Sequence, residues 1–93
     1  MAQADVQAIL RFTGSVQGVG FRYTVRQIAT GYAVTGTVRN VSNGSVECVV
    51  EGSRKEIDAF VADILIEMAR YIHDHSCQWA PATGQFTGFG IVT

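Results

Sequence analysis

The sequence lacks any long apolar run and shows no basic leader. No stretch approaches the about 18–20 apolar residues that a membrane-spanning helix needs. The N-terminal segment MAQADVQAILRF has neither a basic start nor an uninterrupted apolar stretch, which argues against a secretory signal. We therefore expect a cytoplasmic protein with no membrane partner.

The chain also lacks an excess of charge. Its seven Lys and Arg and eight Asp and Glu leave a net charge of −1, and the basic residues are scattered. This argues against the broad basic surface that binds nucleic acid. With 47% hydrophobic residues among 93, disorder is not expected. The length suits a single domain over 1–93 with one core.

Cysteine is scarce as well. The spacing of Cys48 and Cys77 matches no metal-binding motif. We expect two reduced, buried thiols, and the alternative is a disulfide bridge between them. His73 and His75 alternate on an expected strand without a third ligand nearby. We expect no metal and no organic cofactor.

The apolar patterns predict seven elements in the order strand, helix, strand, strand, helix, strand, strand. The segment around Asn43 and Gly44 predicts a hairpin. Ser53 and Glu56 have the form of a capping box at the start of the second helix. The helices begin at Phe21 and after Ser53, and the expected strands are 6–12, 36–41, 45–52, 72–79 and 86–92.

This order predicts an α+β fold, the ferredoxin-like βαββαβ sandwich, with an extra C-terminal strand. Two helices would cover one face of a mostly antiparallel sheet. In the strand 45–52, Cys48 would point into the core. Glu47 and Glu51 would lie on a solvated outer face or at a sheet edge.

The segment GSVQGVGFR places three glycines and an arginine between a strand and a helix. Glycine lets the backbone approach a ligand closely, and the first amides of a helix favour an anion. A cation in the first turn is otherwise mildly unfavourable. Gly14, Gly18, Gly20 and Arg22 therefore have the makings of a phosphate cradle, although a simple connecting turn would look similar.

Two longer motifs resemble the acylphosphatases, namely GSVQGVGFR and GTVRNVSNGSVECVVEG. The resemblance implies a small monomeric hydrolase that converts an acyl phosphate into a carboxylate and phosphate without a covalent intermediate. By position it assigns Arg22 and Asn40 as catalytic residues. It assigns phosphate binding to the loop residues Ser15, Val16, Gln17, Gly18, Val19 and Gly20.

The chain departs from the family at three places. Phe12 stands where the family usually has an aliphatic residue, and Thr37 where it usually has an aromatic one. The segment EMARYI lacks a Gly-Pro pair that is common after the second helix. In the usual strand order of this fold, the first strand separates the strands of Cys48 and Cys77, which argues against a bridge.

Two other functions stay open at this point. A non-catalytic anion-binding module could share the fold, as in the domains that begin larger hydrogenase-maturation proteins. An RNA-binding module shares the topology, but it stacks bases on sheet aromatics. Here the expected central strands, 6–12 and 45–52, contain a single aromatic residue, Phe12.

Overall fold

The computed structural model describes residues 4–92. All seven predicted elements are present, although the last strand starts three residues later than expected and the first runs on to Gly14. The elements are β1 (Val6–Gly14), α1 (Phe21–Ala29), β2 (Val34–Asn40), β3 (Val46–Gly52), α2 (Arg54–Glu67), β4 (Ile72–Pro81) and β5 (Phe89–Val92).

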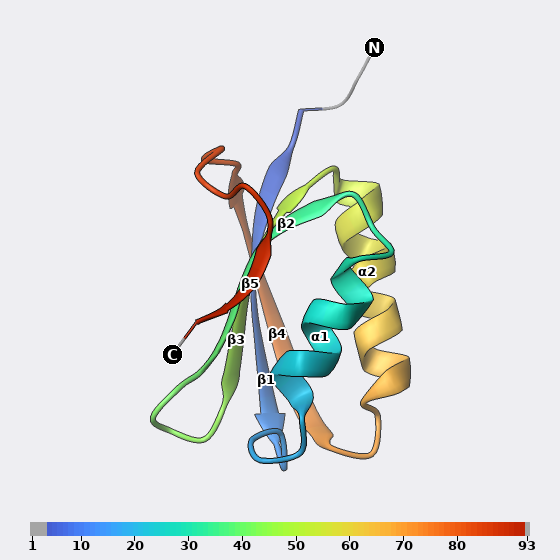
Figure 1. Ribbon diagram of the computed structural model, residues 1–93, viewed down its shortest axis with the longest axis vertical. Coiled ribbons are helices and arrows are strands. Elements are labelled where there is room, and N and C mark those ends of the chain that lie inside the picture. Colours follow the sequence, from blue (N-terminus) through green and yellow to red (C-terminus); the bar gives the residue numbers. More distant parts are fainter. Residues whose placement is uncertain (1–3, 93) are drawn as a thin grey trace.

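The five strands form one sheet in the order β4-β1-β3-β2-β5. Neighbouring strands are antiparallel except β2 and β5, which are parallel. Both helices cover the same face of the sheet, and β5 adds the extra edge strand (Figure 1). The predicted ferredoxin-like sandwich is therefore confirmed. Neither helix within residues 4–92 has the length and apolar character needed to cross a membrane.

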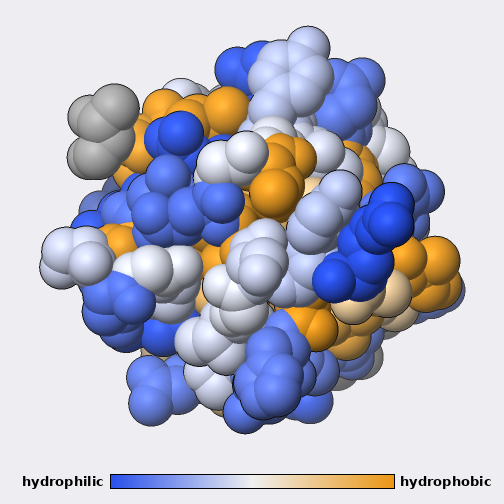
Figure 2. All heavy atoms as spheres, turned by 90° about the horizontal axis from the view of Figure 1, so that it is seen from below, coloured by the Kyte–Doolittle hydropathy of each residue, from blue (hydrophilic) through white to orange (hydrophobic). Residues whose placement is uncertain are grey.

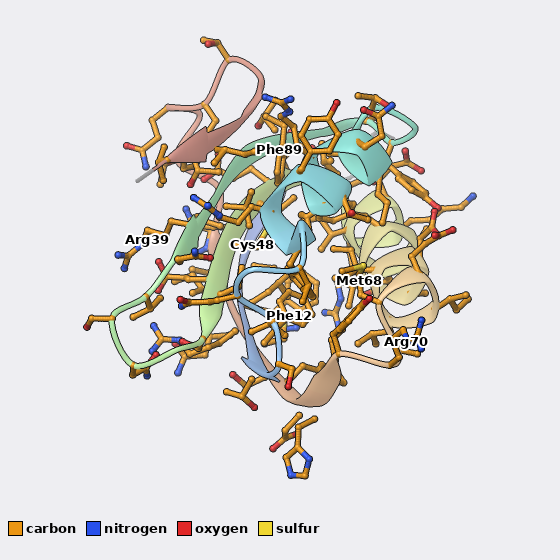
Figure 3. All side chains as sticks on the ribbon, turned by 60° about the horizontal axis from the view of Figure 1, so that its bottom comes forward. Phe12, Arg39, Cys48, Met68, Arg70 and Phe89 are labelled. Atoms are coloured by element: carbon orange, nitrogen blue, oxygen red, sulfur yellow. The ribbon has the colours of Figure 1, made fainter. Side chains whose placement is uncertain are left out.

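The core lies between the sheet and the helices. Alternate residues of the central strands point to this side, as the two-residue period of a strand requires. Figure 3 shows Phe12 and Cys48 on the helix side, whereas Arg39 projects from the opposite face. The largest fully buried side chains include Leu10, Phe12, Phe21, Ile57, Phe60 and Ile64.

The start of α2 carries half of the predicted capping box. The Ser53 hydroxyl accepts a hydrogen bond from the Glu56 backbone N–H at 3.2 Å. The Glu56 carboxylate does not complete the box, because it accepts instead from the backbone N–H of Ala33 at 2.8 Å. This contact ties the start of α2 to the segment that leads into β2.

The prediction for the β3 glutamates holds only in part. β3 is the middle strand, so neither residue lies at a sheet edge. Glu47 lies on the outer face but is covered by two arginines, and the solvated position is wrong for the buried Glu51. The Glu47 side chain is 15% exposed and accepts from Arg11 at 2.7 Å and Arg39 at 2.9 Å. Burial raises the pKa of Glu47, but the hydrogen bonds and charges of these arginines outweigh it and leave that pKa lowered. Glu51 is buried under the loop between β4 and β5, where Thr83 donates to it.

The two cysteines differ in environment, and both are free. Leu10 of β1 lies opposite Cys48 on one side and Cys77 on the other, so β1 separates them as expected. Cys48 is buried, which raises its thiol pKa. The interpretation of both as buried thiols is wrong for Cys77, because it lies on the exposed edge strand β4.

Candidate functional site

The strand directions bring two distant segments to one end of the molecule. Because β1 and β2 both run antiparallel to β3, they are parallel to each other and end on the same side. The loop 15–20 follows β1, and Asn40 closes β2. Figure 1 shows this loop and the β2–β3 hairpin at the lower end, and Figure 2 looks onto that end.

The loop 15–20 is fixed by three anchors. The Ser15 backbone N–H donates to the carbonyl oxygen of Tyr71 at 3.0 Å. The side chain of Val16 is fully buried in the core. The Gln17 side-chain amide donates to the carbonyl oxygens of Val41 and Ser45 at 2.8 and 2.9 Å. The loop is thus held against both the core and the β2–β3 hairpin.

Glycine at two loop positions is explained by backbone torsion. Gly18 and Gly20 have φ angles of 79° and 75°, in the left-handed region that other residues rarely adopt. Nothing lies within 4 Å of the place where a Cβ would sit at either glycine. The requirement is therefore conformational, and the space beside the loop is open.

The start of α1 leaves its first amides available. Gly20 provides no side-chain cap, and no acidic residue lies in the first turn. Such a helix terminus carries partial positive charge and favours an anion. Arg22 is half-buried in this turn and pairs with no carboxylate of residues 4–92. The region therefore has positive potential without a protein counter-ion.

Asn40 faces α1 because it lies two residues after the buried Val38 on the same strand. The residue between them, Arg39, points to the opposite face and is held there by Glu47. The side-chain oxygen of Asn40 is buried, and no hydrogen-bond partner for it lies within the described residues. Buried polar atoms normally have a partner, so this oxygen is suited to a small bound molecule.

A cavity of about 160 Å³ brings Arg22 and Asn40 together. Of the six loop residues assigned by the sequence, three line this cavity, whereas Ser15, Gln17 and Val19 do not. An arginine, a helix N-terminus and a side-chain amide can together bind a phosphate-sized anion and orient a water molecule. The lining residues are Val16, Gly18, Gly20, Phe21, Arg22, Tyr23, Asn40 and Ile91.

Three lining residues were not predicted as site residues, namely Phe21, Tyr23 and Ile91. Phe21 is the buried first residue of α1. Tyr23 follows Arg22 on α1, and an exposed aromatic in a helix first turn is a signal that the sequence did contain. Ile91 lies on β5 opposite Val38 of β2, and hence close to Asn40. Its place depends on the parallel pairing of β2 with β5, which no local pattern indicates.

Comparison with known proteins places these features in a family. The acylphosphatase family model matches residues 8–91. The acylphosphatase of Paenarthrobacter aurescens is 39% identical over 93 residues, covering 99% of each chain.

Solved structures agree with the sequence comparison. The crystal structure of acylphosphatase from Bacillus subtilis superimposes with a TM-score of 0.85 and 29% identity, covering 95% of this chain and 99% of that one. A full-length HypF, in a phosphate- and nucleotide-bound form, matches with a TM-score of 0.79 and 31% identity, but only over 13% of its length. From the family model and the near full-length match, the chain belongs to the acylphosphatase family of enzymes.

Proposed function

We propose that this enzyme hydrolyses acyl phosphates by direct attack of water on phosphorus. Arg22, the amides of the loop 15–20 and the start of α1 bind the phosphate group. Asn40 orients the attacking water. The observation that carries the proposal is the cavity lined by both Arg22 and Asn40, with the buried Asn40 oxygen unpaired within the described residues.

The reaction needs positioning and charge stabilisation more than a strong base. The carboxylate of an acyl phosphate is a good leaving group, and phosphoryl transfer passes through a loose transition state. A neutral amide cannot take a proton near pH 7. The Asn40 oxygen instead accepts a hydrogen bond from the water, which leaves a lone pair of the water oxygen free to face phosphorus.

The bond changes are those of a simple hydrolysis. The water oxygen forms a bond to phosphorus while the bond from phosphorus to the acyl oxygen breaks. The carboxylate leaves with the electron pair, and the water proton passes to a phosphoryl oxygen of the substrate. Arg22 and the backbone amides stabilise the charge on the phosphoryl oxygens throughout.

A covalent intermediate has little support among the residues that line the cavity. None of them is a Ser, Cys, His, Asp or Glu, and the Tyr23 phenol is the sole nucleophilic oxygen in that set. The hydroxyl group of a phenol is a weak nucleophile unless a neighbouring base activates it. Hydrolysis in ¹⁸O-labelled water should place the label in phosphate and none in the carboxylate. A label in the carboxylate would overturn attack at phosphorus.

The proposal is tested by hydrolysis of benzoyl phosphate in a chelating buffer by the wild type, Arg22→Ala and Asn40→Ala. Asn40→Ala should lose about 100-fold or more in kcat while inhibition by inorganic phosphate stays close to wild type. Arg22→Ala should lose rate and also weaken phosphate inhibition. Arg54→Ala, at the far end of α2 from the site, is the matched control for removing an arginine.

Two outcomes would contradict the proposal. A folded wild type that binds phosphate but does not hydrolyse benzoyl phosphate would be an anion-binding module. Full activity in folded Asn40→Ala would remove Asn40 from the mechanism. Circular dichroism and thermal unfolding of each variant separate these results from a loss of fold.

A further inference from the structure

A second hollow adjoins the phosphate-sized cavity and shares one wall with it. We call it the Tyr23 groove; its volume is about 350 Å³, and Tyr23, Thr24, Gln27, Ile28 and Glu67 line it. Tyr23 also lines the cavity that contains Arg22 and Asn40. The same aromatic side chain therefore lines both spaces.

The helices explain why these residues share the groove. Four of the lining residues belong to α1, and neighbours among them are adjacent in sequence or one helical turn apart. They therefore lie on one side of that helix; they are Tyr23, Thr24, Gln27 and Ile28. The fifth, Glu67, is the last residue of α2. Ile28 is half-buried against the core, which gives the groove an apolar floor.

We propose that the Tyr23 groove binds the acyl group of the substrate, and that the enzyme prefers acyl phosphates with an aromatic or bulky, uncharged acyl group. This inference rests on the proposed function, because it places the acyl group relative to a phosphate bound beside Arg22. It assigns Tyr23 as a specificity-determining residue.

The geometry of in-line attack supports this placement. The leaving oxygen must lie opposite the attacking water on phosphorus. A water held by Asn40 lies on the sheet side of the cavity, so the acyl oxygen leaves on the side away from the sheet. Tyr23 comes from α1, lines the cavity and is 59% exposed. Its ring is thus available to contact an acyl group that extends out of the cavity.

The charges around the groove favour an uncharged acyl group. Glu67 lines the groove, and its negative charge would repel a second anionic group on the substrate. The Arg26 guanidinium stacks over the Tyr23 ring, 5.1 Å from its centroid, and does not line the groove. Arg26 therefore packs on the ring, and Glu67 is the charged residue among those that line the groove.

The first test compares kcat/KM for benzoyl phosphate with kcat/KM for acetyl phosphate. In the wild type the ratio should favour benzoyl phosphate, and Tyr23→Ala should lower that ratio about five- to tenfold. Tyr23→Phe, which keeps the ring, should retain the wild-type ratio. Inhibition by inorganic phosphate, which has no acyl group, reports separately on the phosphate site.

The second test addresses charge with succinyl phosphate, whose acyl group carries a carboxylate. Glu67→Gln should raise its kcat/KM relative to acetyl phosphate by about two- to fivefold at low salt, and less at high salt. Asp58→Asn makes the same change in net charge on an exposed part of α2 outside the groove, and it should leave the ratio as in wild type.

The outcomes separate this inference from the proposed function. If the wild type hydrolyses acyl phosphates but both ratios are unaffected by Tyr23→Ala and Glu67→Gln, the groove is not the acyl site and only this inference fails. If the wild type hydrolyses none of the three substrates, the proposed function itself fails.

Discussion

The side-chain amide nitrogen of Gln17 lies 2.8 Å from the backbone carbonyl oxygen of Val41 and donates a hydrogen bond to it. The same nitrogen donates to the carbonyl oxygen of Ser45 at 2.9 Å. Gln17 belongs to the loop 15–20, and Val41 directly follows Asn40. One side chain thus sets the distance between the proposed phosphate-binding loop and the residue proposed to orient water.

Replacing Gln17 with Ala should therefore impair both stability and catalysis. Loss of two hydrogen bonds should lower the free energy of unfolding by about 1–2 kcal/mol. The position of the loop relative to Asn40 would no longer be fixed. Inhibition by phosphate should therefore weaken, and kcat should fall by roughly tenfold or more. Urea unfolding and steady-state kinetics measure the two effects.

Gln17→Glu is the informative companion variant. It keeps the size of the side chain but places a carboxylate without an N–H donor against two carbonyl oxygens, so it should be at least as harmful as Ala. Normal kcat and phosphate inhibition in a merely less stable Gln17→Ala would mean that the contact supports the fold alone.

Gln17 also illustrates what the sequence could and could not predict. The motif placed it in the loop, but its role depends on carbonyls 24 and 28 residues away that only the folded sheet brings close. Elements and their order follow from local patterns, such as alternation in strands and the Ser53 cap. The Glu56 contact with Ala33 and the burial of Glu51 depend on which strands become neighbours.

Glu51 provides a prediction about acid stability. Its carboxylate accepts hydrogen bonds from Gln7, from the N–H and hydroxyl of Thr83, and from the N–H of Gly84, all at 2.8–2.9 Å. Burial raises the pKa of Glu51, but the hydrogen bonds from Thr83, Gly84 and Gln7 outweigh it and leave that pKa below 4.5. These bonds tie the loop between β4 and β5 to the sheet.

The sign of the pH effect follows from this lowered pKa. The unfolded chain binds the Glu51 proton more readily than the native chain, so the stabilisation is complete above pH 4.5 and is lost as the pH falls through the native pKa. Glu51→Gln should lower the free energy of unfolding at pH 7 by about 2 kcal/mol. In this variant the free energy of unfolding should also fall less steeply than in the wild type as the pH is lowered. Urea unfolding at several pH values between 3 and 7 tests this, with the exposed Asp58→Asn as control. An unchanged acid decline in Glu51→Gln would contradict the assignment.

The two cysteines should differ sharply in reactivity. Cys77 is exposed on β4, whereas Cys48 is buried in the core, where burial raises the pKa of its thiol. An aromatic disulfide reagent at pH 8 should therefore titrate one thiol in the native protein and two in denaturant. Native Cys77→Ser should show none. Equal reaction of both thiols in the native state would mean that the core opens readily.

Thr37 offers a route to greater stability. It lies on the open face of the sheet, opposite Gly90 of β5, beside a hollow of about 400 Å³ that Phe86 also lines. A tyrosine there would cover the glycine and contact Phe86. Thr37→Tyr should raise the free energy of unfolding by about 0.5–1.5 kcal/mol, since a pair of packed aromatic rings contributes in that range.

Thr37→Val is the matched control for this substitution, because it keeps the branched side chain that suits a strand but adds no ring. It should change stability much less than Thr37→Tyr, and kcat should stay at the wild-type value in both variants, since residue 37 points away from the cavity. Equal free energies of unfolding for the two variants in urea would show that filling the hollow does not stabilise the fold. A gain confined to Thr37→Tyr would show that the missing aromatic side chain is a cost in stability that the active site does not require.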